Sequence, residues 1–216
     1  MKYTIVIGNK NYSSWSMRPW LVLDHFGLAY EEVMVPLDMP ETRPTILEHS
    51  PAGKVPVLLD GGFAVWDSMA IIEYLAERHP DLPIWPAELQ ARSRARSLAM
   101  EMHAGFAGLR TSCPMNLKVV KRFKHRGGSA TARDVARFEA MVRDRLARSG
   151  GPFLFGEWTA VDAMYAPVAA RLTGYSWPME GPTRAYVEAV QGEASYRKWR
   201  AAGLEETWVH PRVDKA

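Results

Sequence analysis

Strand and helix patterns alternate over the first 80 residues of this chain and then give way to helix patterns alone. The early strand segments are short β-branched or aromatic runs, and the early helix segments repeat apolar residues at helical spacing. The order β-α-β-α-β-β-α predicts a small α/β sandwich. Its predicted strands and helices are 3–8, 17–26, 30–35, 45–49, 57–59, 63–65 and 67–78.

A proline-punctuated stretch, 81–86, follows this alternation, and after it no strand pattern occurs. The helices that we predict beyond it are 88–111, 115–124, 132–148, 160–172, 183–191 and 195–202. We therefore expect two domains, a mixed one over residues 1–80 and an all-helical one over residues 87–216.

The composition excludes several classes of protein. Hydrophobic residues are 47% and charged residues 24% of the 216, which is typical of a soluble globular protein. No apolar run approaches the ~18 residues of a membrane span, so no membrane association is expected. Cys113 is the only cysteine and the six histidines are scattered, so we expect neither a disulfide nor a metal site. A reducing cytoplasm fits this usage.

The net charge of +3 conceals an asymmetry between the two parts. Residues 1–80 carry six Lys and Arg against ten Asp and Glu, a net charge of −4, and the remainder carries +7. The basic residues of the second part alternate with acidic ones along helical stretches. Such alternation is typical of solvated helix faces, so no nucleic-acid partner is expected.

A Val-Pro step, Val55-Pro56, stands at the head of the third predicted strand. Proline has no N–H for the strand ladder and holds the preceding residue in an extended conformation. If this bond is cis, the chain turns sharply and leaves the N–H and C=O of Val55 facing outward. A small extended peptide could then pair with Val55 as an added strand does.

The segment from Pro51 to Leu58, together with Asp67 to Leu75 and the all-helical second part, resembles the cytosolic glutathione S-transferases. The resemblance covers nearly the whole chain and points to a serine-type, zeta- or theta-like bacterial member. It implies an α+β protein: a thioredoxin-like N-terminal domain with a mixed four-stranded sheet, followed by an all-α domain that contributes the electrophile pocket.

By this resemblance, five residues would bind glutathione, which is an extended peptide with a carboxylate at each end. Val55, turned by Pro56, would hold the cysteinyl backbone. Ser68 and the positive end of its helix would hold the γ-glutamyl carboxylate, while Asp67 holds the ammonium group and Lys54 attracts the glycyl carboxylate. The alternative is that Asp67 and Ser68 only cap a helix.

The residue that activates the glutathione thiol should follow the first strand. A hydroxyl that donates to the sulfur at a helix N-terminus favours the reactive thiolate. Matching the family's helix arginine to Arg18 selects Ser13, and a shorter spacing selects Ser14. Tyr12 ranks third among the hydroxyls. The alternative is that these serines cap the helix and that Ser16 is its N-cap.

The electrophile pocket should lie between the first helix and the long helix after the proline-rich stretch, lined by Trp15, His103, Phe106 and Arg110. Phe106, like Met100 and Met102 of the same stretch, is more often a plain core residue than pocket lining. Arg18 is expected either to extend its head group to solvent or to reach a carboxylate at the domain boundary. In the second part, the spacing of Thr159 and Asp162 resembles the family's buried capping box, which would serve folding.

The predicted function is conjugation of the glutathione thiolate to a small hydrophobic electrophile, as in detoxification. Glutathione would be a co-substrate, with no permanently bound cofactor, and a homodimer is expected from the resemblance. One alternative is a glutathione-dependent, maleylacetoacetate-like cis–trans isomerase, although Trp15 stands where the zeta motif has cysteine. The other is a non-catalytic binding or regulatory protein on the same fold.

Overall fold

The N-terminal region folds around a four-stranded sheet in the computed structural model, which describes residues 2–214. Strand β1 (Tyr3–Gly8) is parallel to β2 (Tyr30–Val35) and antiparallel to β3 (Val57–Asp60). Strand β4 (Phe63–Trp66) lies antiparallel to β3 at the edge of the sheet. The order β2-β1-β3-β4 confirms the predicted mixed sheet.

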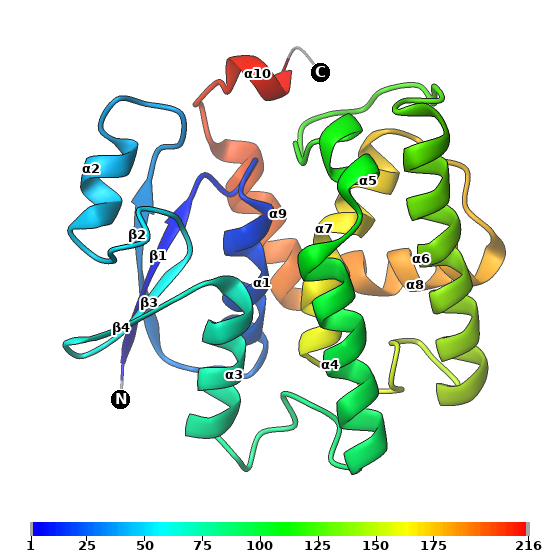
Figure 1. Ribbon diagram of the computed structural model, residues 1–216, viewed down its shortest axis with the longest axis horizontal. Coiled ribbons are helices and arrows are strands. Elements are labelled where there is room, and N and C mark those ends of the chain that lie inside the picture. Colours follow the sequence, from blue (N-terminus) through cyan, green and yellow to red (C-terminus); the bar gives the residue numbers. More distant parts are fainter. Residues whose placement is uncertain (1, 215–216) are drawn as a thin grey trace.

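Helices cover both faces of this sheet (Figure 1). Helices α1 (Ser14–His25) and α3 (Ser68–Arg78) pack on one face, where Ile5 joins the main hydrophobic core. Helix α2 (Thr42–Leu47) covers the other face, where Val6 belongs to a smaller core. The two cores use successive residues of β1 because neighbouring side chains of a strand point to opposite faces.

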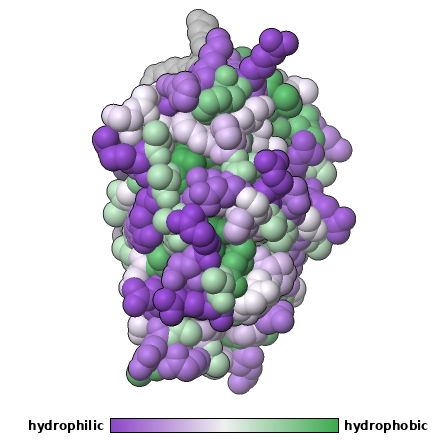
Figure 2. All heavy atoms as spheres, turned by 90° about the vertical axis from the view of Figure 1, so that its right-hand side faces the viewer, coloured by the Kyte–Doolittle hydropathy of each residue, from purple (hydrophilic) through white to green (hydrophobic). Residues whose placement is uncertain are grey.

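Apart from two isolated β-bridges at 153–157, the regular elements of the described residues after the sheet are helices, which confirms the predicted helical C-terminal part. Helix α7 (Ala160–Gly174) lies in its middle, with nearly all of its residues buried, and packs against α1, α4 (Leu89–Ala104) and α8 (Gly181–Gly192). On the side of the molecule that carries α6, hydrophilic residues cover most of the surface (Figure 2). The helices are α4 (Leu89–Ala104), α5 (Ala107–Ser112), α6 (Gly128–Ser149), α7 (Ala160–Gly174), α8 (Gly181–Gly192), α9 (Ala194–Glu205) and α10 (Pro211–Asp214).

The prediction of one helix over 88–111 is wrong, because the chain breaks between α4 and α5. Gly105 is extended and Phe106 has a left-handed φ of 57°. The guanidinium group of Arg110 donates from Nη1 to the carbonyl oxygens of His103 and Gly105, at 3.1 and 3.3 Å. These bonds satisfy carbonyl groups that the end of α4 leaves without a helical partner.

The predicted helix over 115–124 is also wrong, because its backbone groups bond to distant segments. The N–H of Leu117 donates to Oδ1 of Asn11 at 2.7 Å, and the N–H of Lys121 donates to the carbonyl oxygen of Gly174 at 2.8 Å. Each of these bonds replaces one that a helix would have formed locally. The segment therefore connects the loop after β1 to the end of α7.

The capping box at the start of α7 is formed as the sequence suggested. Asp162 is fully buried and accepts the N–H of Thr159 at 2.9 Å, the N–H of Leu154 at 3.2 Å and the hydroxyl of Tyr186 at 3.0 Å. Burial raises the pKa of this carboxyl group to about 6, although these donors oppose the shift. Asp162 thus joins α7 to the preceding turn and to α8.

Replacing Asp162 with alanine should lower the free energy of unfolding by about 2–4 kcal/mol, because several buried donors lose their acceptor. Urea unfolding followed by circular dichroism measures this loss. The control is Asp144→Ala, which removes an exposed carboxylate paired with Arg148 and should change stability little. Equal losses in the two variants would contradict the role given to Asp162.

The pH dependence of protein stability provides a second test of the role of Asp162. The raised pKa means that the folded protein keeps a proton which the unfolded chain has already lost, between the ordinary value of 3.8 and about 6. The contribution of Asp162 to stability therefore falls as the pH rises through that window. The free energy of unfolding of the Asp162→Ala variant should therefore fall less over this pH window than that of the wild-type protein.

Candidate functional site

A cleft of about 280 Å³ lies where α1, the turn before β3 and the start of α3 meet. It contains all five residues that were predicted to bind glutathione, together with three others. Those five come from two short segments, the turn before β3 and the start of α3. The lining residues are Trp15, Ala52, Lys54, Val55, Pro56, Trp66, Asp67 and Ser68.

The Val55-Pro56 peptide bond is cis. The ladder between β3 and its neighbours begins at Val57, so Val55 lies outside it and lines the cleft instead. A residue in that position can offer its backbone N–H and C=O to an extended ligand. This is the arrangement that we expected from the sequence if the Val55-Pro56 bond is cis.

Asp67 and Ser68 form the start of α3. Asp67 is the N-cap, and its Oδ1 accepts the N–H of Met69 at 2.8 Å and the N–H of Ala70 at 3.4 Å. Its φ of 74° is rare for a residue with a side chain, and such strained positions concentrate at functional sites. Ser68 is 1% exposed, and its Oγ has no hydrogen-bond partner among the described residues.

Ser13 and Ser14, the first two of the candidate hydroxyls after β1, have different partners. Ser13 is the N-cap of α1, and its Oγ accepts the N–H of Ser16 at 3.3 Å and donates to Oγ of Ser16 at 2.7 Å. Oγ of Ser14 accepts a hydrogen bond from Nη2 of Arg171 at 3.2 Å. The alternative that Ser16 is the N-cap is therefore wrong, and neither Ser13 nor Ser14 is among the residues that line the cleft.

The loop that carries these serines is held by the helical part. Glu206, at the end of α9, accepts the N–H of Lys10 at 2.6 Å and the N–H of Asn11 at 3.1 Å. Nε1 of Trp199 donates to the carbonyl oxygen of Lys10 at 2.9 Å. The position of Ser13 therefore depends on contacts made far along the chain.

Trp15 connects the cleft to a group of basic side chains. Its ring lines the cleft, and the guanidinium carbons of Arg18 and Arg110 lie 4.3 and 4.5 Å from its ring centroid. The ring of His103 meets it edge to face, with centroids 5.1 Å apart. Of the four residues predicted for the electrophile pocket, the structure brings Trp15, His103 and Arg110 together. Phe106 is buried and packs against Tyr165.

Arg18 differs from both expectations drawn from the sequence. It is 1% exposed, so its head group does not reach solvent, and it forms no ion pair with a carboxylate of the described residues. Burial, followed by the nearby charges of Arg171 and Arg110, lowers its pKa to about 9. Its place three residues after Trp15 on a helix could have indicated that the two share a face.

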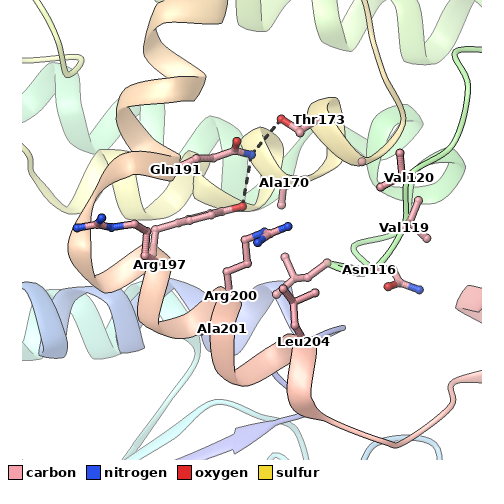
Figure 3. A pocket seen from close by; sticks show the side chains of 13 residues that line it. Asn116, Val119, Val120, Ala170, Thr173, Gln191, Arg197, Arg200, Ala201 and Leu204 are labelled. Carbon is pink, nitrogen blue, oxygen red and sulfur yellow. Dashed lines mark hydrogen bonds between the residues drawn. The ribbon is translucent and has the colours of Figure 1, made fainter.

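A larger hollow, of about 600 Å³, lies between α7, α9 and the segment after α5 (Figure 3). Its lining includes Arg197 and Arg200 but no carboxylate, histidine or cysteine, and none of the predicted site residues. Gln191 bridges Thr173 and Tyr196 above the hollow.

The described residues contain no group of three or more His, Cys, Asp or Glu side chains that could hold a metal ion. None of the described helices is both long and apolar enough to cross a membrane.

Comparisons with known proteins agree with this geometry. The family described as glutathione S-transferase, N-terminal domain, matches residues 12–78. A Caenorhabditis elegans protein named probable maleylacetoacetate isomerase is 36% identical over 108 residues, which are 50% of this chain and 47% of that protein. Glutathione S-transferase 1 of Dianthus caryophyllus is 28% identical over 170 residues, 77% of each chain.

Among curated relatives, a zeta-class glutathione S-transferase of Euphorbia esula is 42% identical over 82 residues, 38% of this chain. The match spans 36% of that relative, and thus, like the match to the worm protein, less than half of its length. The fold extends further than these matches. A Burkholderia glutathione transferase homolog solved with bound glutathione superposes with a TM-score of 0.75 at 24% identity, covering 95% of this chain and 100% of the other. Residues 12–78 therefore match the N-terminal domain of the glutathione S-transferase family, and the chain has the fold of a glutathione transferase.

Proposed function

We propose that this protein is a glutathione transferase that joins the sulfur of glutathione to a small hydrophobic electrophile. The cleft carries the proposal, because Val55 lies beside the strand ladder there, opposite the N-terminus of α3. An extended tripeptide with a carboxylate at each end fits such a pair of features. Residues 1–80 would bind glutathione, and residues 87–216 would complete the electrophile pocket.

Each end of the peptide has a group of matching chemistry in the cleft. The hydroxyl of Ser68, which lacks a partner in the structure, would donate to the γ-glutamyl carboxylate at the positive end of α3. The carboxylate of Asp67 would attract the ammonium group, and Lys54 the glycyl carboxylate. The cysteinyl part between them would pair with the backbone of Val55.

Ser68→Ala should raise the dissociation constant of glutathione about 10-fold or more, because a hydrogen bond to a charged group contributes about 1.5–3 kcal/mol. Isothermal titration calorimetry measures the constant directly. The matched control is Ser97→Ala on α4, whose exposed hydroxyl donates to the carbonyl oxygen of Ser93. An unchanged constant in the Ser68 variant would count against this binding mode.

Ser13 would favour the thiolate form of the bound glutathione. As the N-cap of α1 it lies at the positive end of the helix, and Trp15 of the same turn lines the cleft. Its proton, now donated to Ser16, would turn to the sulfur when glutathione binds. Ser14 is the alternative: its Oγ accepts a hydrogen bond from Nη2 of Arg171 of α7, and its own proton stays available. The sulfur would then attack the electrophilic carbon, and the leaving group would depart with its bonding electrons.

Ser13→Ala should lower kcat/KM for conjugation of glutathione to 1-chloro-2,4-dinitrobenzene about 10- to 100-fold, since the thiol of the complex loses its donor. The pKa of the bound thiol, followed by its ultraviolet absorbance, should rise in the same variant. Ser97→Ala again serves as the control. If Ser13→Ala and Ser14→Ala both leave conjugation unchanged, the enzymatic proposal fails, and retention on immobilised glutathione without any activity would favour a binding protein.

A glutathione-dependent cis–trans isomerase is the second candidate. The specific observation in its favour is the likeness to the worm protein named probable maleylacetoacetate isomerase. Against it stands Trp15, at the position where the zeta motif has a cysteine. Isomerisation of a maleyl diketo acid that requires added glutathione, at a rate above that of conjugation, would reverse the ranking.

We also propose a cytoplasmic homodimer. Large apolar side chains are exposed on β4, at Phe63 and Trp66, and on α4, at Leu89 and Met100. Pairing of the sheet region of one copy with the helical part of another would cover them, and the opposite net charges of the two parts favour that pairing. Light scattering at micromolar concentration tests the dimer directly.

A further inference from the structure

Buried polar groups without partners gather around Trp15 and the start of α3. They are Nε and Nη1 of Arg18, Nδ1 of His103 and Oγ of Ser68, none of which has a hydrogen-bond partner among the described residues. Nε2 of His103 lies 3.4 Å from Oδ2 of Asp67, which ties this histidine to the cleft. Buried polar groups are nearly always paired in native proteins, so such a cluster indicates a polar ligand.

The same region holds positive charge without negative charge to match it. Arg171 donates only to neutral acceptors, the carbonyl oxygens of Cys113 and Pro167 and the hydroxyl of Ser14. Arg110 donates to carbonyl oxygens as well, and Arg18 has two unpartnered nitrogens. Burying a guanidinium group without an anion is costly, and the pKa of Arg18 is lowered accordingly.

The nearest carboxylate is already occupied. Oδ1 of Asp67 accepts the first N–H groups of α3, and Oδ2 faces His103. Asp67 therefore leaves the charge of Arg18 and Arg110 uncompensated by hydrogen bonds. A ligand anion placed beside Trp15 would satisfy both guanidinium groups, because the planar fork of arginine matches a carboxylate with two parallel N–H bonds.

We propose that Arg18 and Arg110 bind a carboxylate on the electrophile, so that the acceptor substrate is a small electrophilic acid with an apolar body. The ring of Trp15 would pack against that body, between the arginines and the cleft that holds glutathione. This inference rests on the proposed function in one respect only: the proposed function is what makes the bound acid a substrate of the conjugation reaction. The carboxylates of glutathione itself are the other possible source of the anion, and the experiment separates the two.

A matched pair of electrophiles tests the proposal: 4-chloro-3,5-dinitrobenzoate and its methyl ester. In both, the glutathione thiolate forms a bond to the ring carbon, chloride leaves with the bonding electrons, and the thiol proton passes to solvent. The wild-type protein should show a kcat/KM at least about 10-fold higher for the acid, the range expected of a charge-assisted hydrogen bond. Equal constants for acid and ester would overturn the proposal.

Two variants locate the carboxylate. Arg18→Met and Arg110→Met should each lower the ratio of the acid and ester constants about 10-fold or more. Arg133→Met, which changes an exposed arginine of α6, should leave the ratio at its wild-type value. If the arginine variants instead raise KM for glutathione and leave the ratio unchanged, the anion is a carboxylate of glutathione and the proposal is wrong.

A binding measurement removes the dependence on turnover. The unreactive analogue 3,5-dinitrobenzoate should raise the Tm of the wild-type protein, and its methyl ester should raise it less. Arg18→Met should remain folded, because its buried charge has no partner to lose, and should show no added shift with the acid. An equal shift in wild type and variant would overturn the proposal. Arg18-dependent binding of the acid without conjugation of either electrophile would reject the proposed function and keep the carboxylate site.

Discussion

Burial of α1 between the sheet and α7 is the contact on which the rest of the structure depends. The helix is apolar on more than one side, and Met17, Leu21, Val22 and Leu23 are all almost completely buried. A helix of this kind must be covered from two directions. The sheet covers one side and α7 the other, while Trp199 of α9 makes an edge-to-face contact with Trp20 of α1. The N-terminus of α1 is thereby fixed where the cleft opens.

Most of the fold could be predicted because its elements are written in local patterns. The β-branched run of β1 and the helical spacing of α3 each lie within a few residues, and the observed bounds agree closely with the predicted ones. The failures lie where distant groups compete for the backbone. Asn11 binds the N–H of Leu117, and Arg110 binds the carbonyl groups at the end of α4. No window of sequence around residue 117 contains Asn11.

The site divides in the same way. Val55, Pro56, Asp67 and Ser68 could be chosen as neighbours because the two short segments that carry them resemble those of a known family, and the cleft does contain them. The environment of Arg18 could not be predicted, since it depends on how distant segments pack and leave Nε and Nη1 without a hydrogen-bond partner among the described residues. The sequence shows which groups are present. Whether a buried side chain lacks a hydrogen-bond partner is decided only when the chain packs.

The loop before Ser13 is bonded to Glu206, Trp199 and Leu117, all of which belong to the helical part. The sheet region therefore does not carry the geometry of its own first loop. In evolution, the two parts of such a protein are not free to recombine as independent modules. An exchange that kept both hydrophobic cores would still lose these side-chain bonds unless the donor carried equivalents at the same places. Such a dependence favours inheritance of the sheet region and the helical part together.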